Sequence, residues 1–190
     1  MRIIYLALIL TTLLACNNST KPNNNTVSNT AKGEKEFQEY LDRKAKKYKG
    51  KAAKDITVTT LDGKTLQLSK LKGKVVLLSF WFMACKPCIT EIPSLTELQS
   101  KYGEKDFVLL AISTDQEDRL RSFVEGKALK YSVIADGKTH ADRYDVSTFP
   151  SNFLIDKKGI IREVFIGGSD WNATQTYMEV KPHLEDFLTE

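Results

Sequence analysis

Apolar and polar residues are spaced in patterns that predict strands and helices from residue 51 onward. Val75–Trp81 is a continuous apolar stretch, which is typical of a strand buried on both faces. In Lys86–Tyr102, residues such as Ile89 and Leu95 recur at helical spacing. Gly103 follows at the position where many helices end. We therefore expect a central buried strand that leads through a short loop into a helix.

Weaker patterns of the same kind complete the predicted domain, and the dipeptide Asp62-Gly63 indicates a hairpin turn. Further strands are expected at residues 56–61, 65–68, 107–112, 132–135, 152–155 and 160–166. Further helices are expected at residues 116–125, 139–144 and 171–188. The order β-β-β-α-β-α-β-α-β-β-α predicts an α/β fold, with a mixed central sheet flanked by helices.

The first 50 residues differ from this domain. Residues 1–15 hold Arg2 and an apolar stretch, which predicts a secretory signal peptide. The ending Leu13-Leu14-Ala15-Cys16 resembles a bacterial lipobox, which implies cleavage before Cys16 and lipidation of that residue. The alternative is an ordinary signal peptide with an incidental cysteine. Residues 16–50 are expected to form a tether that is flexible over 17–33 and helical over 34–49, followed by the domain at 51–190.

Charge is distributed unevenly along the 190 residues, whose formal net charge is +4. Residues 17–54 carry ten Lys or Arg against four Asp or Glu, whereas residues 55–190 carry 17 basic and 20 acidic residues. A nucleic-acid-binding domain needs its basic excess on the folded part. The sequence therefore argues against nucleic acid as a partner.

The strongest chemical motif is Cys85-Lys86-Pro87-Cys88, at the predicted start of the helix. Cysteines three residues apart on a first helical turn lie close enough for a disulfide. The positive end of the helix and the Lys86 cation favour a thiolate at Cys85, and Pro87 suits the first turn. We therefore predict that Cys85 is the exposed attacking nucleophile and Cys88 the buried resolving thiol.

Glu91 lies one helical turn after Cys88. Our hypothesis is that a partly buried Glu91 takes and returns the proton of the thiol pair. The alternative is a solvated glutamate on the helix surface.

Residues 51–190 resemble the TlpA/ResA-like thiol–disulfide oxidoreductases of the thioredoxin superfamily. The strand ending at Trp81, the CxxC pair and Glu91-Ile92-Pro93 carry the resemblance, together with residues 144–156. It implies a thioredoxin fold with an N-terminal β-hairpin and a central αβ insertion at residues 116–131. It also implies a cis Phe149–Pro150 bond facing the cysteines. Substrate-binding residues are then expected at Trp81, Lys86, Pro87, Phe149 and Pro150.

Two departures from the family concern redox potential and partner choice: Ala84 replaces a bulky residue, and Lys86-Pro87 replaces Gly-Pro. Together with the lipobox-like sequence before Cys16, the resemblance implies a lipid-anchored envelope protein that faces the periplasm and exchanges dithiol for disulfide with protein partners. The expected direction is reduction, for example of apocytochrome c, fed by a membrane electron donor. No bound cofactor is expected.

Three other functions remain to be considered. A zinc site would need ligands beyond the cysteine pair, but His140 and His183 lie far along the chain without paired spacing. A peroxiredoxin-like peroxidase would have threonine where this chain has Phe82. A non-catalytic lipoprotein binding module would use the disulfide for structure alone, although so short a loop adds little stability.

Overall fold

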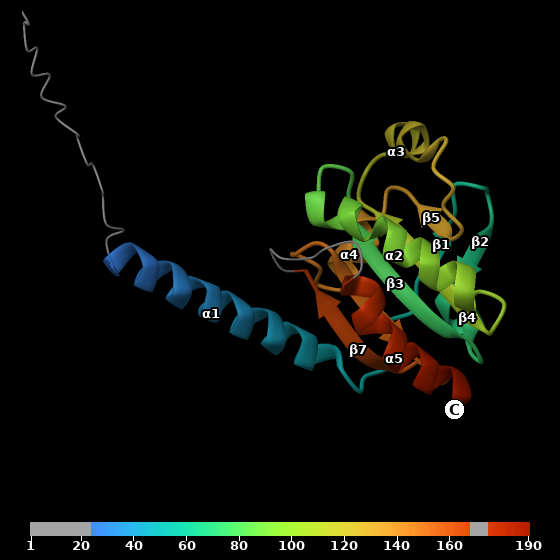
Figure 1. Ribbon diagram of the computed structural model, residues 1–190. Coiled ribbons are helices and arrows are strands. Elements are labelled where there is room, and N and C mark those ends of the chain that lie inside the picture. Colours follow the sequence, from blue (N-terminus) through green and yellow to red (C-terminus); the bar gives the residue numbers. More distant parts are fainter. Residues whose placement is uncertain (1–23, 168–174) are drawn as a thin grey trace, which may run out of the picture. The chain divides into compact units, whose positions relative to one another are not determined.

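The computed structural model describes residues 24–167 and 175–190 (Figure 1). The chain divides into two compact units, Met1–Gln38 and Glu39–Glu190. The predicted signal peptide, the predicted lipidation site Cys16 and the predicted helix start at residue 171 lie outside the described residues. The second unit holds every strand of the described chain and the CxxC motif.

A five-stranded mixed sheet forms the centre of the second unit, in the order β5-β4-β3-β6-β7. β3, β4 and β5 are parallel, whereas β6 and β7 run antiparallel to their neighbours. The strands are β3 (Val75–Trp81), β4 (Phe107–Ser113), β5 (Ser132–Ile134), β6 (Ser151–Ile155) and β7 (Ile161–Ile166). Every residue of β3 is buried, because this strand is central and covered on both faces.

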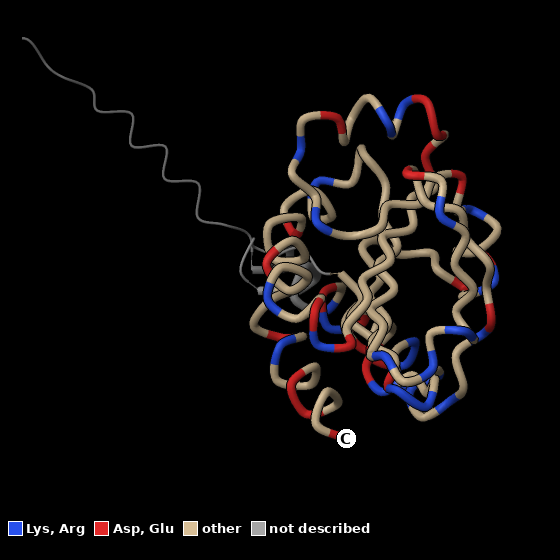
Figure 2. Tube along the Cα trace, turned by 90° about the vertical axis from the view of Figure 1, so that its right-hand side faces the viewer, with Lys and Arg blue, Asp and Glu red and all other residues tan. Residues whose placement is uncertain are grey.

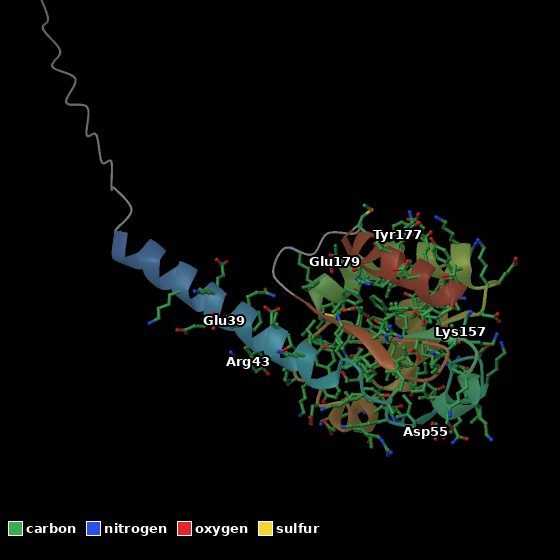
Figure 3. The ribbon with its side chains drawn as sticks, turned by 90° about the horizontal axis from the view of Figure 1, so that it is seen from below. Glu39, Arg43, Asp55, Lys157, Tyr177 and Glu179 are labelled. Carbon is green, nitrogen blue, oxygen red and sulfur yellow. A yellow bond between two sulfur atoms is a disulfide. The ribbon has the colours of Figure 1, made fainter. Side chains whose placement is uncertain are left out.

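Helices cover both faces of the sheet, as the mixed α/β pattern predicts. Odd-numbered residues of β3 pack with α2 and α5, whereas Val76, Leu78 and Phe80 pack with α4 and the hairpin. The helices are α2 (Lys86–Tyr102), α3 (Glu117–Val124), α4 (Lys138–Arg143) and α5 (Gln175–Thr189). In Figure 3, Tyr177 and Glu179 mark α5 on one side of the domain and Asp55 marks the opposite side.

The hairpin and the insertion are confirmed. β1 (Thr57–Thr59) and β2 (Thr65–Gln67) pair antiparallel around the predicted turn, and the short 3-10 helix η1 (Leu68–Leu71) follows. Gly63 adopts φ +82° in that turn, a backbone conformation that favours glycine. The insertion consists of α3 and the edge strand β5. Charged residues lie around the outside of the domain, while the central strands carry few (Figure 2).

The N-terminal helix is longer than predicted. α1 spans Asn24–Tyr48, so the expectation of a flexible chain over 17–33 is wrong from residue 24 onward. Adding residues to an existing helix costs far less than nucleating one, so the helix extends into a sequence of low propensity. Its last part belongs to the second unit, which begins at Glu39 instead of residue 51. Leu41 and Tyr48 are buried there.

Candidate active site

The two cysteines lie at the start of α2 and form a disulfide with a Cα–Cα distance of 5.3 Å. Cys85 is the N-cap residue of the helix, and its Sγ accepts a hydrogen bond from the Cys88 backbone N–H at 3.3 Å. Cys85 is 6% exposed and Cys88 is 1% exposed. Cys85 is therefore the more accessible of the two residues, although in the disulfide state it is not the exposed residue that the sequence predicts.

The loop before Cys85 is held by Asp115, a residue that the sequence does not mark as part of the site. Asp115, just beyond the end of β4, accepts hydrogen bonds from the Met83 backbone N–H at 2.7 Å and from Ser113 Oγ at 2.8 Å. The Cys85 N–H donates to the Phe82 carbonyl at 3.1 Å. The Asp115 contacts connect the loop to β4, the neighbour of β3. No local pattern around Asp115 indicates this contact across 32 residues.

Glu91 is more deeply buried than the hypothesis of a partly buried side chain assumed, and the alternative of a solvated glutamate is wrong. It is 1% exposed, and its carboxylate accepts hydrogen bonds from three neutral groups. Asn152 Nδ2 donates at 3.0 Å, Thr176 Oγ1 at 3.2 Å and Ser79 Oγ at 3.4 Å. Burial raises the pKa of Glu91 to about 7, while the three hydrogen bonds act in the opposite direction.

None of these three donors is predicted from the sequence. Ser79 is a polar residue within the apolar run of β3, and Asn152 is a polar residue in the buried strand β6. A polar residue inside a buried strand must find a hydrogen-bonding partner, and this need is the one sign that the sequence carries. The partner itself is not evident from the sequence, because Asn152 lies 61 residues from Glu91.

The Phe149–Pro150 segment lies next to the CxxC loop. Its peptide bond is cis, as the resemblance implies. The ring of Phe149 meets that of Phe82 edge to face, with centroids 5.1 Å apart, and both side chains are partly exposed. Pro150 itself is buried, and its carbonyl accepts the Gly167 N–H at 2.8 Å. Phe82 and Phe149 thus bring partly exposed aromatic surface to the loop that contains Cys85.

The other predicted substrate-binding residues differ in exposure. Lys86 is exposed and Pro87 is partly exposed on the first turn of α2. Trp81 is 4% exposed, and its ring packs against Phe123 of the insertion with centroids 6.0 Å apart. In the disulfide state Trp81 therefore offers little surface to a substrate, and its predicted role in substrate binding stays a prediction.

The end of α1 holds the chain that precedes Phe149. Lys47 Nζ lies 2.5 Å from Asp145 Oδ2, and the Tyr48 hydroxyl donates to the same oxygen at 2.9 Å. Lys44 donates to the Asp145 carbonyl at 3.0 Å and to Ser147 Oγ at 2.5 Å. Hydrogen bonds from Lys47 and Tyr48 lower the pKa of Asp145. These contacts join α1 to the segment that leads into the cis peptide.

The described part of the chain shows neither a metal cluster nor a membrane-spanning helix. Across residues 24–167 and 175–190, no three His, Cys, Asp or Glu side chains gather as a metal site. Over the same ranges, no helix combines the length and the apolar character needed to cross a bilayer. A hollow of about 550 Å³ lies near the far end of α2 from the cysteines, where Gln99 and Gly103 line it.

Known proteins are similar to this chain in sequence and in fold. Residues 49–164 match the AhpC/TSA family. The thiol-disulfide oxidoreductase ResA of Bacillus thuringiensis is 38% identical over 145 residues, which cover 75% of this chain and 84% of the relative. The solved thioredoxin domain of a thiol-disulfide oxidoreductase from Bacteroides vulgatus shares 28% identity at a TM-score of 0.61, covering 72% of this chain and 97% of that one.

A second solved structure, the exposed lipoprotein thioredoxin of Streptococcus pneumoniae, shares 29% identity at a TM-score of 0.54 and covers 66% of this chain and 99% of that one. These similarities confirm the predicted thioredoxin fold and the enzyme class. The chain therefore belongs to the AhpC/TSA family, and it is a ResA-like thiol–disulfide oxidoreductase of the thioredoxin superfamily.

Proposed function

We propose that this oxidoreductase works as a reductase of protein disulfides outside the cytoplasm. The observation that carries the proposal is the Cys85–Cys88 pair at the start of α2, with Glu91 buried one turn further along. The similarity to ResA supports exchange with protein thiols and disulfides. The proposed donor of electrons is a membrane protein, and apocytochrome c is one proposed substrate.

The proposed exchange has two steps. In the reduced enzyme, the Cys85 thiolate attacks one sulfur of the partner disulfide, which gives a mixed disulfide and releases the first partner thiolate. The Cys88 thiolate then attacks Cys85 Sγ, forms the Cys85–Cys88 disulfide and releases the second partner thiolate. Two electrons pass to the partner. The helix N-terminus stabilises a thiolate at Cys85, its N-cap residue.

Glu91 is the proposed proton acceptor for Cys88 during the second step. A carboxyl group with a pKa of about 7 can accept and release a proton near neutral pH. Cys88 and Glu91 lie one turn apart on α2 and are both buried, which supports a proton transfer shielded from bulk water.

The proposed substrate surface consists of Lys86, Pro87, Phe149 and Pro150. The partly exposed Phe82, in edge-to-face contact with Phe149, adds apolar area to it. Because Pro150 is buried, its contribution is to shape the backbone beside the cysteines. We expect Phe149→Ala to weaken binding of a protein partner without abolishing the reaction of Cys85 with a small disulfide.

We also propose that lipidation of Cys16 anchors the protein to a membrane, with the domain facing the periplasm. The lipobox-like sequence before Cys16 supports this, as does the similarity to the exposed lipoprotein of Streptococcus pneumoniae. Labelling cells with a radioactive fatty acid tests the anchor. The native chain should take up label and a Cys16→Ser variant should not.

The direction of electron flow is tested by the equilibrium reduction potential of the Cys85–Cys88 pair. A value near or below the roughly −270 mV of thioredoxin supports a reductase. A value near the roughly −120 mV of a strong oxidant reverses the proposed direction. A rapid reaction of Cys85 with peroxide would instead favour the peroxidase alternative.

The separate roles of the two cysteines are tested by trapping. A Cys88→Ser variant cannot complete the second step, so it should accumulate mixed disulfides with partner proteins. Cys85→Ser should accumulate far fewer, because its remaining thiol is buried. Non-reducing gels of both variants measure this difference, and equal trapping would contradict the assignment of Cys85 as the nucleophile.

A further inference from the structure

The surroundings of Glu91 are entirely neutral at the level of direct contact. Its three hydrogen-bond donors come from three elements: Ser79 from β3, Asn152 from β6 and Thr176 from α5. The disulfide-forming cysteines share its helix, α2. Tyr131, before β5, also senses the charge of Glu91, and burial and Glu91 both raise the pKa of Tyr131. Among the described residues, no cation contacts the carboxylate.

The position of Asn152 is set by the backbone of the sheet. Asn152 is the direct partner of Ser79 in the antiparallel pairing of β3 with β6. Both residues are buried, and both side chains reach the same carboxyl group on α2. Asn152 makes the shortest of the three contacts, at 3.0 Å. A group on a central strand is held more rigidly than one on a loop, so it can orient Glu91 reproducibly.

One atom of Asn152 remains without a partner. While Nδ2 donates to Glu91 Oε2, the carbonyl Oδ1 is buried and has no hydrogen bond to any described residue. Buried polar atoms without partners are rare and costly in folded proteins. A primary amide offers a donor at one end and an acceptor at the other, which a single rotation exchanges. A carboxylic acid, unlike a carboxylate, has an O–H that needs an acceptor.

We propose that Asn152 is a positioning residue that serves both protonation states of Glu91. Its N–H group stabilises the carboxylate, and after rotation of the amide its Oδ1 accepts the O–H of the protonated acid. The amide thereby keeps both states of Glu91 hydrogen-bonded during the proposed proton transfer. This inference rests on the proposed role of Glu91. It adds that Asn152 of β6, two residues after Pro150, controls the proton affinity of Glu91 on α2.

The test is a ¹³C NMR titration of the Glu91 carboxyl group in the oxidised full-length chain, where the cysteines do not titrate. Asn152→Leu removes the donor to the carboxylate, so the pKa of Glu91 should rise by about one pH unit or more. Asn152→Thr keeps a shorter donor and should give a smaller rise. Glu91→Gln identifies the signal by removing it. Ser151→Ala is the matched control, because Ser151 donates to the Thr148 carbonyl and not to Glu91.

An unchanged Glu91 titration in Asn152→Leu would overturn the inference. If that variant does not fold, a titration of Asn152→Thr identical to that of the native chain overturns it equally. The proposed function is judged separately, by the pH dependence of thiol alkylation in the reduced chain. If Asn152→Leu moves the Glu91 titration but neither it nor Glu91→Gln alters the thiol profile, the proton role of Glu91 fails and the inference about Asn152 stands.

Discussion

The carboxyl groups of Glu91 and Asp145 lie near the Phe149–Pro150 segment in opposite environments. Glu91 is buried among neutral donors that include Asn152, and its pKa is raised to about 7. Asp145 lies at the surface, where the Lys47 cation and the Tyr48 hydroxyl lower its pKa. Desolvation dominates at the first site, and hydrogen bonds from a cation and a hydroxyl dominate at the second. The first environment suits proton transfer, whereas the second suits attachment of α1.

Among the substitutions that test this comparison, Glu91→Gln should have the largest effect, which is on the pH dependence of folding stability. The carboxyl group of Glu91 has its ordinary pKa of 4.5 in the unfolded chain and about 7 in the folded chain. As the pH rises between these values, the unfolded chain loses this proton while the folded chain keeps it. Folding is therefore weakened by roughly 3 kcal/mol across this range. The glutamine variant should lack this loss.

Guanidinium unfolding of the oxidised protein at pH 5 and pH 8 measures the difference. Glu97→Gln is the matched control, because Glu97 is an exposed glutamate on the same helix. The explanation by burial would be wrong if native and Glu91→Gln chains lost equal stability between the two pH values.

A smaller effect on stability is expected from Gly167→Ala, which acts on the Phe149–Pro150 segment between Asp145 and Asn152. A Cβ at Gly167 would lie 2.5 Å from Pro150 Cδ and 3.1 Å from the Phe149 carbonyl oxygen. Because both neighbours are held by the backbone, the added methyl should cost about 1–3 kcal/mol and slow reaction with protein disulfides. Gly33→Ala is the control, since its Cβ meets nothing within 4 Å. Thermal unfolding and turnover of a protein disulfide measure both effects.

The smallest effect is expected from Asp145→Asn. The Lys47–Asp145 pair is half exposed, so its contribution should be modest and should shrink as salt is added. Because the pKa of Asp145 is lowered in the folded chain, its stabilising effect is present above the unfolded pKa and is lost as the pH falls through the folded one. Thermal melts at low and high salt test this. A large, salt-independent loss would show that the contact is not that of an exposed ion pair.

Local patterns were enough to predict much of the domain. The predicted bounds of β3 and α2, Val75–Trp81 and Lys86–Tyr102, agree with the structure. A continuous apolar run and a helical repeat are strong patterns because they record burial directly. The start of α1 was missed, because residues 24–33 lack an apolar repeat and extend a helix formed by the residues after them.

The sequence by itself determined the order of elements, the CxxC pair at a helix N-terminus and the place of Glu91 one turn later. These features depend on residues close together in the chain, so spacing alone reveals them. Only the tertiary structure decided that Trp81 packs against Phe123 and that Asn152 and Thr176 meet Glu91. Such contacts arise when sheet pairing and helix packing bring distant residues together. Whether the glutamate is a solvated side chain or a buried acid depends on those neighbours and on the water that they exclude.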